Sequence, residues 1–133
     1  MQQSDAEAVK AAVYAIYAAL SARDMGMMEP LWVHNSDVVV VNVRNKVPSI
    51  GWDACKKNWQ SVFDAYSEVR AVPEHAPHIQ FLHGVASATS VIAVQGKNKA
   101  GQPLSLSVLS TQIFVKPGDR WLAVAHHASR VPD

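Results

Sequence analysis

The chain has 133 residues, of which 49% are hydrophobic and 17% are charged, and its formal net charge is +1 with neutral histidines. This length fits one domain with its own core. The near-neutral charge, without a basic or acidic block, excludes an electrostatic nucleic-acid surface, and no apolar run reaches the ~20 residues that span a bilayer. We therefore expect neither a nucleic-acid partner nor a membrane partner.

The sequence contains one cysteine, Cys55. A single cysteine cannot form a disulfide within the chain, and the N-terminus has no basic segment followed by an apolar stretch, so we expect a cytoplasmic protein. No helix N-terminus or histidine is evident beside Cys55 to activate its thiol. We interpret it as a small core residue rather than a nucleophile.

Two helices are predicted ahead of the first strand. Ser4 and Glu7 fit a capping box that opens a helix ending near Ala22. Asp24 can cap a short second helix over residues 25–28, which Pro30 limits. The apolar arc of the first helix consists of Val9, Val13, Ile16, Tyr17 and Leu20.

A valine-rich run at residues 38–43 predicts a first strand that is covered on both faces. A turn through Asn45, Lys46 and Pro48 follows, and Gly51 opens a third helix. The apolar residues at helical spacing in this third helix are Trp52, Cys55, Trp59, Val62, Phe63 and Tyr66.

The rest of the chain is predicted to be sheet. The expected strands lie near residues 68–74, 78–83, 85–95, 103–116 and 120–129, with turns at 96–101 and 117–119. Helices first and antiparallel strands afterwards indicate an α+β domain in which a curved sheet wraps around the helices.

The last strand holds two adjacent histidines, and strand side chains alternate between faces. One face carries Leu122, Val124, His126 and Ala128, and the other carries Trp121, Ala123, Ala125, His127 and Ser129. His126 and His127 therefore point apart and cannot serve one site together.

Four segments carry a resemblance to a known family. They are residues 17–24, Leu31-Trp32 with the strand entry at 37–40, Gly51-Trp52-Asp53, and residues 120–132. Their order and spacing resemble the nuclear transport factor 2-like superfamily, in particular its SnoaL-like branch of ketosteroid-isomerase-like proteins. The last segment is also similar to the end of the association domain of calcium/calmodulin-dependent kinase II. The resemblance covers nearly the whole chain, as one domain over residues 1–133.

The resemblance implies a cone-shaped α+β barrel, with a curved, mostly antiparallel sheet around the helices and an apolar internal pocket. Leu122, Val124, His126 and Ala128 would face that pocket, whereas Trp121, His127 and Ser129 would lie on the outer face or at its edge. The resemblance also implies a homodimer through the convex sheet face. Function does not follow from the fold, which hosts isomerases, dehydratases, cyclases, epoxide hydrolases and non-catalytic scaffolds.

Two activities of such folds require residues that this chain lacks. Ketosteroid isomerases use a tyrosine, an aspartate base and a protonated acid. By the resemblance, Tyr17 matches the tyrosine, but the base position holds Asn42, and the acid position falls at Ser110 or Thr111. The epoxide hydrolases need an Asp–Arg–Asp cluster. Arg44 and Arg70 are present, but no second inward aspartate is evident, so neither activity is expected.

Two hypotheses remain. In the first, a small, largely apolar ligand binds inside the pocket, with cofactor-independent isomerase, dehydratase or cyclase chemistry carried by His126, Tyr17 and Asp37. The same residues also fit plain structural roles, as a bonded histidine, a core tyrosine and a turn aspartate. The expected ligand-binding residues are Trp32, Asn42, Trp52, Trp59, Phe63 and Val124. In the second, the chain is a non-catalytic dimer module whose convex sheet, around Trp121, is the working surface.

Metal and nucleotide sites are not expected. His34, His75, His78 and His83 follow no known ligand spacing. The sequence also lacks a glycine-rich turn from strand to helix, the usual signature of a nucleotide cofactor. We therefore predict neither a metal nor a cofactor.

Overall fold

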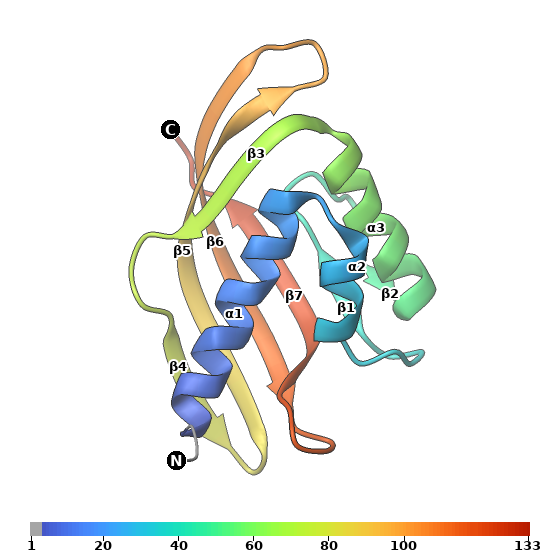
Figure 1. The fold of residues 1–133 in the computed structure, drawn as a ribbon, viewed down its shortest axis with the longest axis vertical. Coiled ribbons are helices and arrows are strands. Elements are labelled where there is room, and N and C mark those ends of the chain that lie inside the picture. The colour runs from blue at the N-terminus through green and yellow to red at the C-terminus, as the bar shows by residue number, and fades with distance from the viewer. Residues whose placement is uncertain (1–3) are drawn as a thin grey trace.

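The structure, a computed structural model, describes residues 4–133 and places its helices against one face of a curved sheet (Figure 1). The helices are α1 (Asp5–Ala22), α2 (Met25–Met28), the 3-10 helix η1 (Glu29–Leu31) and α3 (Trp52–Asp64). The predicted caps are confirmed, because the side chain of Ser4 accepts from the Glu7 backbone N–H and that of Asp24 accepts from Met27, both at 3.2 Å.

The sheet has seven strands in the order β2-β1-β7-β6-β5-β3, and β4 pairs with the other end of β5. Only the β1–β7 pair is parallel among the described strands. The strands are β1 (Val39–Val41), β2 (Ser49–Ile50), β3 (Tyr66–Pro73), β4 (His78–Leu82), β5 (Val85–Asn98), β6 (Pro103–Val115) and β7 (Leu122–Arg130). The predicted α+β fold with a curved, mostly antiparallel sheet is therefore confirmed.

The core lies between α1 and the inner face of the sheet. The helix buries Val9, Val13, Ile16, Tyr17 and Ala19, the stripe that its periodicity predicted, with Ala19 added at the expense of the half-buried Leu20. On β5 every second residue from Ala86 to Val94 is buried, which is the pattern of a strand with one covered face. Within residues 4–133, no helix is long and apolar enough to cross a membrane.

Two expectations about element boundaries are wrong. Tyr66 continues the helical spacing of α3, but the helix ends at Asp64 and Tyr66 begins β3. The strand predicted over 38–43 is confined to Val39–Val41, and the turn after it contains the unpredicted edge strand β2. A two-residue strand carries no periodicity, so the sequence offers no signal for it.

A β-bulge shifts the faces of the last strand. Ala125 pairs with Ile113 and Ala123 pairs with Phe114, so Val124 is the extra residue of β7. Consequently Ala123, rather than Leu122 or Val124, is fully buried at this end, while His126 and Ala128 keep the inward orientation predicted for them.

Trp121 was expected on the outer face or at its edge, and this is wrong. Its side chain is only 9% exposed and lies against the start of α1, where its Nε1–H donates to Asp5 Oδ1 at 3.1 Å. This hydrogen bond, helped by one from Lys116, holds the pKa of Asp5 below its usual value.

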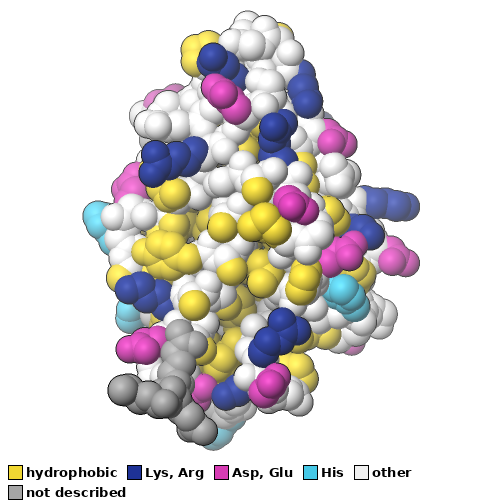
Figure 2. Space-filling view, in the orientation of Figure 1, with side chains coloured by type: hydrophobic (Ala, Val, Ile, Leu, Met, Phe, Trp, Pro, Cys, Tyr) yellow, Lys and Arg dark blue, Asp and Glu magenta, His cyan; other side chains and the backbone are white. Residues whose placement is uncertain are grey.

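The face that the helices cover shows hydrophobic side chains gathered at its centre and charged ones around them (Figure 2).

Candidate functional site

A cavity of about 180 Å³ lies between α1, α3 and the inner face of the sheet. Its apolar lining consists of Leu20, Val43, Val62, Ala65, Val69, Ile92, Val94, Leu106, Val108 and Ala128. Its polar lining consists of Tyr17, Asn42, Arg44, Asn45, Asn58, Ser61, Tyr66 and His126. The lining residues Val43, Arg44, Asn45 and Ser61 are exposed, so the mouth lies where the loop after β1 faces the end of α3.

Helix α3 lines the cavity with one narrow stripe. Asn58, Ser61 and Val62 of α3, together with Ala65 at its C-cap, follow the i, i+3, i+4, i+7 spacing of a single helical face. The aromatic stripe of the same helix is turned away from the cavity toward Trp32. An asparagine at the edge of the apolar arc, three residues after Cys55, was the sequence signal that could have identified Asn58.

A chain of side-chain amides runs from the mouth into the interior, and one backbone group sets its direction. The Asn42 backbone N–H can only donate, and it donates to Asn45 Oδ1 at 2.7 Å. Asn58 must therefore also donate to that oxygen through its Nδ2, at 2.6 Å. This leaves Asn58 Oδ1 to accept from Asn42 Nδ2 at 2.9 Å.

The same logic sets the tautomer of His126. With its Nδ2 bonded to Asn58, Asn42 presents Oδ1 to His126 Nε2 at 3.2 Å, so Nε2 carries the proton. The other ring nitrogen, Nδ1, then accepts from Gln112 Nε2 at 2.9 Å. Both nitrogens are engaged by the protein, and the imidazole is neutral.

Burial favours that neutral form. The His126 side chain is only 2% exposed, and this desolvation, with a smaller contribution from His127, lowers its pKa to about 3. Two rings pack against it: Trp59 with centroids 4.8 Å apart and Tyr17 at 6.4 Å. His126 therefore forms the buried, uncharged polar end of the cavity.

Tyr17 lines the cavity beside His126. Its hydroxyl donates to Ser110 Oγ at 2.6 Å, and burial raises its pKa to about 12. The positions that the resemblance matched to the isomerase tyrosine, base and acid, namely Tyr17, Asn42 and Ser110, thus lie close to one another. None of the three side chains is a carboxylic acid.

Asp37 does not lie with these residues. It occupies an exposed turn before β1, where its backbone N–H donates to Asn35 Oδ1 at 2.9 Å. The partners of His126 are Gln112 and Asn42, not Asp37. The expected His126–Asp37 pair is therefore not present, because the turn keeps Asp37 in solvent outside the sheet's inner face.

Of the residues expected to bind a ligand, only Asn42 lines the cavity. The other five, Trp32, Trp52, Trp59, Phe63 and Val124, are absent from its lining. The reason is aromatic packing, since Trp32 lies 6.1 Å from Trp52 and 6.2 Å from Trp59 between ring centroids, and Trp59 lies 6.4 Å from Phe63. These aromatic side chains pack against one another and, through Trp59, against His126. Val124 is the extra residue of the bulge in β7, so its side chain does not face the cavity.

Cys55 lies at the edge of the same core and is fully buried. Its single S–H has the carbonyls of Val38 and Ser49 as acceptors, each 3.5 Å from Sγ, and burial raises its pKa to about 11. The group is therefore a thiol at neutral pH, not a thiolate nucleophile.

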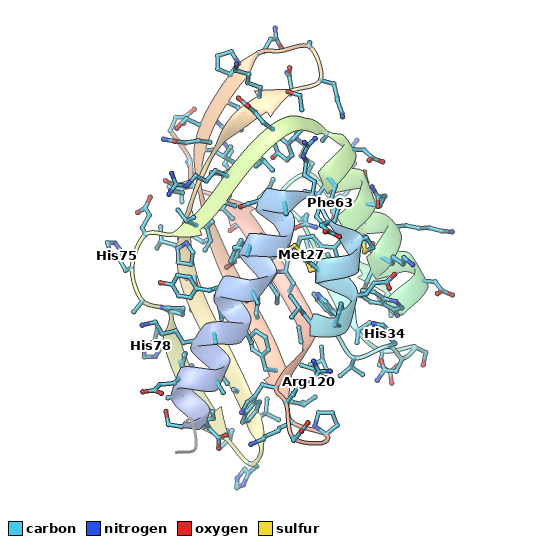
Figure 3. All side chains as sticks on the ribbon, viewed as in Figure 1. Met27, His34, Phe63, His75, His78 and Arg120 are labelled. Carbon is cyan, nitrogen blue, oxygen red and sulfur yellow. The ribbon has the colours of Figure 1, made fainter. Side chains whose placement is uncertain are left out.

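The histidines outside the cavity are widely separated. Figure 3 shows His34 beside α3, and His75 and His78 on the opposite side of the molecule near β4. His34 stacks on Trp52, with ring centroids 4.3 Å apart. Across residues 4–133, no three His, Cys, Asp or Glu side chains lie close enough together to hold a metal ion.

Solved structures show the same fold over almost all of the chain. A proposed dehydratase of the nuclear transport factor 2-like family from Streptomyces avermitilis is 19% identical, with a TM-score of 0.86 over 97% of this chain and 98% of that one. A nuclear transport factor 2-like superfamily protein from Salmonella enterica is 14% identical, with a TM-score of 0.87 over 96% and 92% of the two chains.

A third similar structure is a kinase hub. The calcium/calmodulin-dependent protein kinase II hub of S. rosetta is 21% identical, with a TM-score of 0.78 over 98% of this chain and 100% of that one. No curated protein sequence matches this one at a significant level.

The curved sheet and the helices packed against it give this chain the fold of these nuclear transport factor 2-like structures. The sequence profile of the SnoaL-like domain matches residues 9–133, so the chain belongs to the SnoaL-like domain family. The family resemblance drawn from the sequence is therefore confirmed.

Proposed function

We propose that this SnoaL-like domain binds one small, largely apolar molecule in the cavity between α1, α3 and the sheet. The observation that supports this most is a cavity whose lining is largely apolar, with its polar groups along one side from the mouth to His126. An engineered cavity of roughly 150 Å³ holds a benzene molecule, so about 180 Å³ suits one ring or a short chain.

Binding has more support than acid/base chemistry. A general base needs a free lone pair and a pKa near the working pH. His126 has both ring nitrogens engaged and a pKa lowered to about 3. Tyr17 donates to Ser110 and has a pKa raised to about 12. Isomerase, dehydratase or cyclase chemistry by these residues would require the hydrogen bonds to rearrange first.

A thermal-shift screen with one filled-cavity variant tests the proposal. The panel consists of single-ring ketones, epoxides, alcohols and amides, under the reducing conditions of the cytoplasmic location that we propose from the single Cys55. A ligand at a hundred times its Kd adds about 2.7 kcal/mol to the free energy of unfolding, which is readily measured. In Ala128→Leu, whose larger side chain would occupy the cavity, a hit should lose its shift.

The matched control is Ala88→Leu, on the same sheet face but outside the cavity lining. Overpacking at Ala88 should lower the stability of the free protein by about 1–3 kcal/mol. The Ala128 variant should keep its stability, because the added atoms enter empty space. If both variants lose the same stability, or if the hits still bind to Ala128→Leu, the cavity is not the binding site.

An assembly role is the second candidate, and the outer face of the sheet is what favours it. The outward positions of β5 from Val85 to Gln95 and of β6 from Ser105 to Val115 hold no charged residue, and Leu109 is 46% exposed there. A large exposed uncharged face suits burial against a second copy. We propose a homodimer through this face, in line with the hub domain that shares the fold.

A further inference from the structure

The charge of the cavity lining is one-sided. Among its lining residues Arg44 is the only one with a formal charge at neutral pH, and none is Asp or Glu. In the part of the chain that the structure describes, no carboxylate forms an ion pair with Arg44. The mouth therefore has a guanidinium that is available to a ligand.

The amide chain adds hydrogen-bond donors at the same place. Its oxygens are occupied: Asn42 Oδ1 accepts from His126, Asn58 Oδ1 accepts from Asn42, and Asn45 Oδ1 accepts two N–H groups. Some of its N–H bonds are unused, because the described residues provide no acceptor for Asn45 Nδ2 and only one acceptor for the two N–H bonds of Asn42 Nδ2. The network thus has unused N–H bonds on Asn42 and Asn45, while the side-chain oxygens of Asn42, Asn58 and Asn45 each accept at least one hydrogen bond.

The C-terminal ends of α1 and α3 would oppose the binding of an anion at the mouth. Leu20 lies in the last turn of α1, and α3 ends beside Ala65, so partial negative charges of about half a unit lie near the mouth. Arg23 counters them with a full charge, since its Nη1 donates to the Tyr66 carbonyl at 2.7 Å. The two cations outweigh the two partial charges.

Asp64 and Glu68 are the acids nearest in sequence to the cavity residues Ala65 and Tyr66, and of these two only Glu68 lies near a cation. Asp64 accepts from Gln60 Nε2 at 2.9 Å, and Glu68 lies 3.6 Å from Lys97 Nζ. Neither lines the cavity. Beyond the mouth, the wall of Val69, Ile92 and Val108 offers no polar group to a ligand.

We propose that the ligand of this cavity is a small carboxylic acid of about one ring in size, with its carboxylate bound by Arg44 and the Asn45 amide. Guanidinium binds carboxylate through paired, charge-assisted hydrogen bonds, and amide N–H groups donate to the same oxygens. The apolar body occupies the valine-lined interior. This inference rests on the proposed function, since it assigns a chemical class to the molecule bound there.

The test is a calorimetric titration with two probes of the same shape, phenylacetate and phenylacetamide, at neutral pH and low salt. The wild-type protein should bind the acid about tenfold more tightly, the factor that one added hydrogen bond to a charged group supplies. In Arg44→Gln this ratio should fall to about one, with the affinity for the amide unchanged.

Arg70→Gln is the matched control, since it removes the same charge from an exposed residue of β3 outside the cavity lining. It should keep the wild-type ratio. Equal affinities for acid and amide in the wild type, or an unchanged ratio in Arg44→Gln, would overturn the assignment while leaving cavity binding intact. If neither probe nor any compound of the screen binds, the inference and the proposed function both fail.

Discussion

Gln112 Nε2 lies 2.9 Å from His126 Nδ1 and completes a chain of side chains that begins at the backbone N–H of Asn42. Donation along the chain runs in one direction. Gln112 donates to His126, His126 donates to Asn42, Asn42 donates to Asn58, and Asn58 donates to Asn45. The imidazole is thereby held as a neutral donor to Asn42. His126 closes the cavity as an uncharged polar group.

The first prediction concerns acid stability. The pKa of His126 is about 3 in the folded protein and about 6.5 when the chain is unfolded, so the unfolded state binds the extra proton between these values. The stabilising effect of the neutral ring is complete above about pH 6.5. It is lost as the pH falls, at up to about 1.4 kcal/mol per pH unit.

Urea unfolding measured from pH 7 to pH 4 checks this. His126→Gln should show a shallower fall in the free energy of unfolding than the wild type, and His75→Gln, which changes an exposed histidine, should match the wild type. Parallel pH curves for His126→Gln and the wild type would mean that the buried ring titrates normally.

A second prediction concerns the hydrogen bond from Tyr17 to Ser110, which is 2.6 Å long and buried. A double-mutant cycle with Tyr17→Phe and Ser110→Ala should give a coupling free energy of about 1 kcal/mol, the usual net contribution of such a bond. Chemical denaturation of the four proteins measures it. Strictly additive losses would show that the two hydroxyls do not interact.

A third prediction concerns Gly96, where β5 passes β3 beside the cavity wall. A Cβ at this position would lie 2.3 Å from the Glu68 carbonyl oxygen, so any side chain must push the strands apart. Gly96→Ala should therefore cost about 2 kcal/mol or more. Gly118→Ala meets nothing within 4 Å and should be nearly neutral; equal thermal stability of the two variants would refute the close contact.

A fourth prediction tests the outer face. If two copies associate there, Leu109→Lys should shift the protein toward monomer in sedimentation velocity, because the new charge would be buried at the interface. Ile50→Lys is the control, since Ile50 is 60% exposed but lies on the edge strand β2. A monomeric wild type, or a Leu109→Lys variant that still dimerises, would exclude this interface.

Most of the fold could be predicted from the sequence because its elements are periodic. Four of the five residues predicted for the apolar arc of α1, namely Val9, Val13, Ile16 and Tyr17, are buried, and β5 and β6 form close to the ranges predicted for them. The errors fall where the hydrophobic period in the sequence does not match the element that forms. Tyr66 continues the spacing of α3 after the helix has ended. The bulge at Val124 reverses which residues of β7 face inward on either side of it, and no glycine or proline in the sequence signals it.

The site was less predictable, because amide side chains leave no periodic signal. Asn42, Asn58 and Gln112 come from a strand end, a helix and another strand, and only the closed fold brings them to His126. Tryptophans are typical of ligand walls, but here they pack on one another. The inward orientation of His126 was predicted from strand alternation together with the family resemblance, whereas its hydrogen-bond partners were not predicted.

The most direct test is a methyl-resolved NMR titration with phenylacetate. Val69, Val94 and Val108 line the cavity, whereas Val9 and Val13 are fully buried but do not. If the cavity takes up the probe, the methyl signals of the first set shift in a saturable way and those of the second set stay in place. An unchanged spectrum, or equal shifts in both sets, would contradict binding in this cavity.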